Sequence, residues 1–384
     1  MKKRLYLLLL FIFSLTFYLT LPTAAEADGH ALVEKLPDEY GDLLNALPEE
    51  LLERLPDELF SKDGETLGEG VQKISDFSYL LRTLLRLVGL KLNECVQILA
   101  SVCGLILLSA LFSALRSSFR NERIGAAFSL CSTLAITLAL LTESYNTLTA
   151  VTTYFENLNR FTAASIPLLG ALYALGGNVG AAAASASGLS LYMTLMEELI
   201  GKTILPFCGI CMALALVSAL NPSIRLGSLL ASVKKNYTTA LAFLMMLLLA
   251  MLSAQTLLAA KGDTLLMRGA KFAAGNLIPV VGGSVAELLR SVSAGVGYLR
   301  GAVGICGVLL LLLLLLPTLV KLLLLRLTWQ LSASLADLLG CATEKKLLEE
   351  FTSLLGYLIA AVTICSSILF LALTLLIRCA SAIG

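Results

Sequence analysis

The sequence predicts an all-α, polytopic membrane protein. Of its 384 residues, 58% are apolar and only 14% are charged, which is too hydrophobic for a water-soluble globule. Six apolar runs are long enough to cross roughly 30 Å of hydrocarbon at about 1.5 Å per residue. We expect about six transmembrane helices, at Leu92–Leu115, Ile124–Thr142, Thr203–Leu220, Tyr237–Ala260, Gly301–Val320 and Leu354–Ile377.

Residues 1–27 have the pattern of a cleaved secretory signal peptide. A basic Met1–Arg4 segment precedes the apolar stretch Leu5–Leu21, and Ala25-Glu26-Ala27 is a small-x-small cleavage site. We therefore expect the mature chain to begin at Asp28. The alternative is an uncleaved first membrane helix, because Leu5–Leu21 is long for a signal peptide. In both cases the segment that follows is exported.

Residues 28–75 form a predicted exported segment that is strongly acidic. Between Ala31 and Gly70 twelve acidic residues face three basic ones, a local charge of about −9 in a chain whose net charge is +1. Leu-Pro-acid-acid units begin at Leu36, Leu47 and Leu55 and predict short helices, because proline and acids suit a helix N-terminus. Their leucines, which share one face, are Leu51, Leu52, Leu55 and Leu59. This face predicts either a docking surface for an outside partner or an acidic cap that packs on itself.

Residues 76–384 are the predicted membrane domain, and its basic residues indicate an orientation. Arginines follow the first apolar run at positions 116, 120 and 123, and Arg225, Lys234 and Lys235 follow the third run. Basic residues concentrate in cytoplasmic loops, so we expect both loops and the Lys321–Phe351 segment in the cytoplasm. The mature N-terminus and the short C-terminus then face outward.

Two shorter apolar stretches, Phe161–Gly177 and Phe272–Gly283, are each broken by proline and glycine. We expect two re-entrant or broken-helix hairpins there, although two full spans also satisfy the orientation of Phe161–Leu199. Broken helices at membrane depth expose backbone groups that commonly line a cavity. The candidate pore-lining or cavity-lining residues are Ser165, Pro167, Gly170, Asn276, Pro279, Gly282 and Gly283. The alternative is that these residues only allow close helix packing.

The two stretches also suggest an internal duplication. Arg160–Gly170 resembles Lys271–Gly282 at an offset of about 111 residues, and this offset places the first two apolar runs on the third and fourth. The predicted repeat units are residues 92–199 and 203–300, followed by two terminal spans.

Catalytic chemistry has no visible basis in the sequence. The single histidine, His30, lies beside the cleavage site, so no histidine triad or general base can be assembled. A phosphate-cradling Gly-x-x-x-x-Gly-Lys loop is absent, and Cys208-Gly-Ile-Cys211 lies inside an apolar run, where packing explains it better than metal or redox chemistry. We expect no enzyme activity, catalytic residue, metal, cofactor or nucleic-acid partner.

The layout resembles the stage III sporulation protein AE family of endospore-forming bacteria. The resemblance rests on the acidic exported segment, the multi-span body, the Ala274–Gly283 stretch and the leucine run before Pro317. It implies a multi-pass protein of the mother-cell membrane around the forespore, in a secretion-like channel complex required for forespore development after engulfment. The implied partners are ring-forming subunits and a separate cytoplasmic ATPase. A stand-alone secondary transporter for a small solute is the alternative function.

Overall fold

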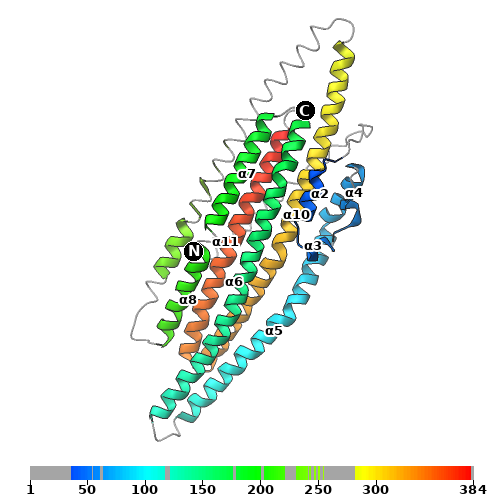
Figure 1. The fold of residues 1–384 in the computed structure, drawn as a ribbon. Helices are drawn as coiled ribbons and strands as arrows, with labels where there is room; N and C mark the ends of the chain where they lie inside the picture. The colour runs from blue at the N-terminus through cyan, green and yellow to red at the C-terminus, as the bar shows by residue number, and fades with distance from the viewer. Residues whose placement is uncertain are drawn as a thin grey trace.

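The computed structural model describes residues 36–53, 55–60, 64–116, 122–175, 179–199, 203–220, 231–240 and 282–381, with six helical residues between 242 and 254. All regular structure within these ranges is helical, which confirms the predicted class (Figure 1). The expected signal peptide and most of the predicted Tyr237–Ala260 span lie outside the described residues.

Long helices form the body of the molecule. They are α5 (Phe77–Arg116), α6 (Glu122–Leu175), α7 (Val179–Leu199), α8 (Leu205–Leu220), α10 (Gly282–Leu338) and α11 (Ala342–Ser381). With 54 and 57 residues, α6 and α10 are each more than about 80 Å long at about 1.5 Å per residue. A bilayer offers only about 30 Å of hydrocarbon, so each of these helices extends well beyond a single crossing.

The helices pack as two antiparallel pairs that lie side by side. In Figure 1, α5 meets α6 and α10 meets α11 at the same end of the bundle, which we call the turn end. Cys103 contacts Ser332 across α5 and α10, and Tyr154 contacts Ser366 across α6 and α11. The α10–α11 connection is a tight turn at Gly340, which has a φ of 72°. Glycine suits this left-handed conformation because it has no Cβ.

The acidic segment folds into short helices, the first three of which begin at the predicted Leu-Pro-acid-acid units. They are α2 (Glu39–Asn45), α3 (Glu49–Leu52), the 3₁₀ helix η1 (Asp57–Phe60) and α4 (Gly64–Ser75). The carbonyls of Pro37, Pro48 and Pro56 accept the N–H groups of Tyr40, Leu51 and Leu59 at 2.9–3.1 Å. Each proline thus starts a helical turn.

The leucine face of this acidic segment packs against its own chain. Leu51, Leu55 and Leu59 are all buried and join the core of the bundle. The Tyr40 hydroxyl donates to the Leu59 carbonyl at 3.0 Å and lies 3.5 Å from Cys306 Sγ of α10. The prediction that these leucines form a docking surface for another protein is therefore wrong.

The predicted first hairpin, Phe161–Gly177, is also wrong over the described residues. Helix α6 continues to Leu175 with Pro167 inside it, and α7 then packs against α6. Proline removes the bond to the carbonyl four residues earlier, at Ala163. Both residues lie on the exposed face of α6, so this carbonyl is not sealed inside the core. The end of α6 and the whole of α7 occupy this region, and the alternative of two full membrane spans here remains a prediction.

Three helices in the described part of the chain are long and apolar enough to cross a membrane. They are Ser78–Phe112, Gly301–Leu338 and Ala342–Thr374, and Pro206–Val217 is a shorter apolar helix. The count of about six spans and the duplication remain predictions.

Candidate functional site

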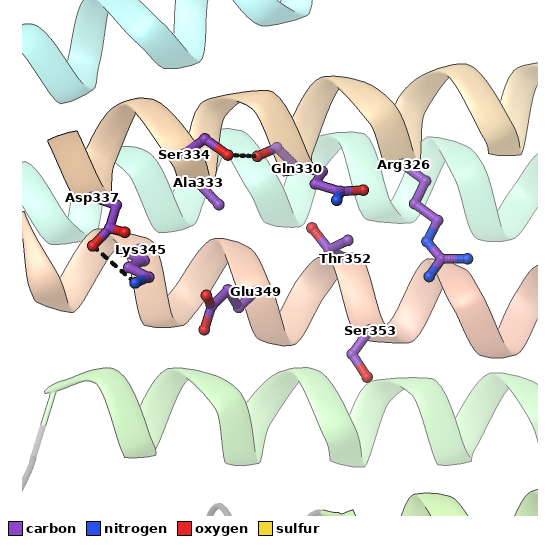
Figure 2. A pocket seen from close by; sticks show the side chains of 9 residues that line it. All are labelled: Arg326, Gln330, Ala333, Ser334, Asp337, Lys345, Glu349, Thr352 and Ser353. Atoms are coloured by element: carbon purple, nitrogen blue, oxygen red, sulfur yellow. Dashed lines mark hydrogen bonds and ion pairs between the residues drawn. The ribbon is translucent and has the colours of Figure 1, made fainter. Parts of the chain in front are cut away.

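Polar side chains gather in an open groove between α10 and α11 near the turn end (Figure 2). The groove has a volume of about 520 Å³. Its lining residues are Arg326, Gln330, Ala333, Ser334, Asp337, Lys345, Glu349, Thr352 and Ser353.

Helix α10 carries two adjacent stripes of side chains, one polar and one apolar. Arg326, Gln330 and Asp337 recur at near-helical spacing and line the groove. Leu323, Leu327 and Leu331 form the neighbouring stripe and are 48–52% exposed. The groove is therefore a polar strip set into an otherwise apolar helix surface, a feature that marks binding or transport paths in membrane proteins.

Charges of both signs line the groove. Lys345 Nζ lies 2.8 Å from Asp337 Oδ1, and this ion pair links the two helices across their turn. The Arg326 guanidinium lies against Gly356 of α11, where an added Cβ would be 3.5 Å away. The absence of a side chain at Gly356 leaves room for the arginine to cross the face of α11.

A buried carboxylate lies on α11 within the turn end. Glu344 is 4% exposed, and its Oε1 accepts hydrogen bonds from Ser109 of α5 at 2.7 Å and Thr133 of α6 at 3.5 Å. Glu344 also lies in the first turn of α11, where the helix dipole favours negative charge. One side chain thus connects the ends of both helix pairs.

A largely buried ion pair attaches residues 231–240 to α11. Lys234 Nζ lies 2.9 Å from Glu350 Oε2, and the lysine side chain is only 3% exposed. The lysine also lies 5.9 Å from the centroid of the Tyr357 ring. Lys234 and the Lys321–Phe351 segment, both predicted to be cytoplasmic, are in contact through this ion pair.

The residues predicted from sequence lie elsewhere. Ser165 is buried and donates to the Phe161 carbonyl of its own helix at 2.7 Å, Pro167 is exposed, and Gly170 is half-buried. All three follow Tyr154, which already contacts Ser366, so they lie farther from the turn end than the groove. Asn276 and Pro279 are outside the described residues, whereas Gly282 and Gly283 begin α10 at the end opposite Asp337.

The groove, the buried Glu344 and the Lys234–Glu350 pair were not predicted from the sequence. The available signal was the presence of ionisable residues inside or beside apolar runs, such as Arg326 and Glu344. The groove offers hydrogen bonds and charges of both signs. Within the described ranges, no three His, Cys, Asp or Glu side chains are grouped to hold a metal ion.

Long apolar helices, a polar groove and a docked acidic segment define a helical membrane protein. The chain belongs to the stage III sporulation protein AE (spore_III_AE) family, whose model matches residues 65–380. It is similar to the stage III sporulation protein AE of Bacillus subtilis (strain 168), with 27% identity over 282 residues, 73% of this chain and 70% of that protein. No solved structure matches the chain.

Proposed function

We propose that this protein is a non-enzymatic membrane component of the channel complex that links the mother cell to the forespore and supports forespore development after engulfment. Membership of a sporulation family over residues 65–380 carries the proposal. The apolar helices Ser78–Phe112, Gly301–Leu338 and Ala342–Thr374 supply the membrane part.

In this proposal the protein lies in the mother-cell membrane that surrounds the forespore, with its mature N-terminus outside the cytoplasm. Lysines and glutamates concentrate at the turn end, including Glu344, Lys345 and Lys346. Basic residues favour the cytoplasmic side, so the turn end faces the mother-cell cytoplasm. In this proposal ring-forming subunits and a separate cytoplasmic ATPase complete the complex, as the resemblance to the family implies.

The α10–α11 groove is the part of the described surface best suited to line a hydrated path. Polar groups at membrane depth need water or a polar partner, and the groove supplies such groups over several helical turns. The sequence-derived candidates Asn276 and Gly282 are a second proposed lining. An Asn276→Cys variant, in a background without native cysteines, should react with a water-soluble thiol reagent if that segment lines an aqueous path.

The decisive experiment is deletion of the gene in its host, with complementation by tagged variants. We expect development to stop after engulfment, and we expect the tagged protein to co-purify with other sporulation membrane proteins. Normal spores combined with a defect in solute uptake during growth would overturn the proposal in favour of the transporter.

A variant with an apolar groove lining tests whether the groove is part of the transport path. Gln330→Leu combined with Ser334→Leu replaces two polar lining groups by apolar ones, and Leu327→Ile changes the neighbouring stripe without adding polarity. We expect the double variant to accumulate normally but to lose spore formation, while Leu327→Ile retains it. Full sporulation of the double variant would remove the groove from the path.

A further inference from the structure

Exposed large apolar side chains are most numerous on the half of the bundle nearer the turn end, and Leu90, Phe243, Met246 and Leu247 are also exposed outside this group. Thirteen of them, each 43–85% exposed, form what we call the apolar belt: Leu92, Val96, Leu107, Leu108, Leu111, Leu134, Leu138, Ile210, Val217, Leu323, Leu327, Leu331 and Leu338. They come from α5, α6, α8 and α10. Soluble proteins rarely expose so many large apolar side chains in one half of the molecule, so we infer an apolar environment for the belt.

The height of the apolar belt matches one bilayer. From Leu92 to Leu111 on α5 the rise is about 29 Å at about 1.5 Å per residue, close to the roughly 30 Å of a hydrocarbon core. The ion pair Glu94–Lys321, at 3.7 Å, joins α5 to α10 at the border of the belt that is farther from the turn end, which we call the upper border. Charged pairs are expected at such a border because it meets the polar headgroups.

On one face of α6 the exposed residues change from apolar to polar at the level of this border. Leu134 and Leu138 are 44% and 68% exposed on its outer side. Farther along the same face, at helical spacing, the exposed residues are Thr149, Thr153, Glu156 and Arg160. A bilayer that covered this second stretch would bury a row of polar and charged side chains in hydrocarbon.

The most hydrophobic stretch of the chain lies above this border. Every residue from Val308 to Leu315 is 0–7% exposed, so protein encloses this part of α10 on all sides. Next to it, Tyr40 contacts Cys306 and places the acidic helices α2 and α4 at this level. A helix that is apolar all round is either a membrane span or a core helix, and this segment has the burial of a core helix.

We propose that the bilayer covers only the turn-end half of the molecule, and that the other half projects from the membrane as a helical domain built around Val308–Leu315. The α10 crossing is then the stretch between Lys321 and Leu338, in place of Gly301–Val320, and Gly282 at the start of α10 lies in the projecting half instead of at membrane depth. Leu81 and Leu85 extend the apolar surface above the belt, but Arg82 and Arg86 are exposed beside them, a mixture typical of the headgroup region.

Leu138 and Thr153 give a matched pair on one face of α6, about 22 Å apart at about 1.5 Å per residue. In a background without native cysteines, Leu138→Cys and Thr153→Cys are exposed to a charged maleimide in permeable vesicles, where both aqueous faces are reached. We expect Thr153→Cys to be labelled in the vesicles. We expect Leu138→Cys to stay unlabelled in the vesicles and to be labelled after detergent is added. Protection of Thr153→Cys, or labelling of Leu138→Cys, would overturn the proposal.

A second measurement keeps the test valid if removal of nine cysteines prevents folding. The chain has one tryptophan, Trp329, so Trp329→Phe provides a silent background. In vesicles of brominated lipid, a tryptophan from Leu138→Trp should lose most of its fluorescence, and one from Thr153→Trp should keep it. Quenching at position 153, or absence of quenching at 138, contradicts the assignment. Both tests are independent of the role in sporulation.

Discussion

The side chain of Tyr40 is one of the contacts between the acidic helices and the bundle. Burial raises the pKa of its hydroxyl well above the ordinary value, so the group stays protonated as the donor to the Leu59 carbonyl. Tyr40→Phe removes this donor and should lower the free energy of unfolding by about 1–2 kcal/mol. Thermal unfolding of the purified protein in detergent measures the change. Tyr145→Phe is the control, because Tyr145 is 72% exposed, and an equal loss in both variants would contradict this role.

The hydroxyl of Ser109 has a comparable role at the turn end. It donates to the buried Glu344 side chain at 2.7 Å, and a buried acceptor that loses its donor costs about 1–3 kcal/mol. We expect Ser109→Ala to reduce stability by about this amount. On the same helix, Ser101 is exposed and donates only to the Gln97 carbonyl. Ser101→Ala should therefore leave the unfolding midpoint almost unchanged, and a midpoint that is insensitive to both changes would refute the contribution of Glu344.

At the scale of elements, the α10–α11 turn depends on one glycine. Gly340 has a φ of 72°, where an added Cβ costs roughly 1–2 kcal/mol. Gly340→Ala should lower the unfolding midpoint. Gly104→Ala should raise it slightly, because Gly104 lies inside α5 with open space around its missing Cβ, and alanine favours a helix by about 1 kcal/mol. Changes of the same sign in both variants would show that the backbone at position 340 is not the cause.

Local signals explain which elements could be predicted from the sequence. The short helices after Pro37, Pro48 and Pro56 were predictable because each proline carbonyl accepts the first bond of its own turn. The continuation of α6 through Pro167 was not, because packing on α7 outweighs the local breaker. The groove and the Glu344 contacts were also beyond reach, since they depend on which helices lie side by side.

At the scale of the whole molecule, the parallel packing of α5 and α10 can be tested by one substitution. Cys103 Sγ lies 3.9 Å from Ser332 Oγ, so Ser332→Cys should form a disulfide with the native Cys103 under a membrane-permeable oxidant. Mass spectrometry of the digested protein detects the linked peptides. Ser334→Cys is the control, because Ser334 lines the groove on another side of α10. A link that forms from Ser334→Cys but not from Ser332→Cys would reverse the assigned faces of α10.

The contact between Tyr40 and Cys306 has a consequence for biosynthesis. These residues are 266 positions apart, so at about 5–20 residues per second the ribosome makes Cys306 roughly 13–53 s after Tyr40. During this interval Tyr40 and helix α4 have no α10 to pack against. The earliest helices of the domain are thus among the last to be secured, and a chaperone that shields exposed leucines would act on them first.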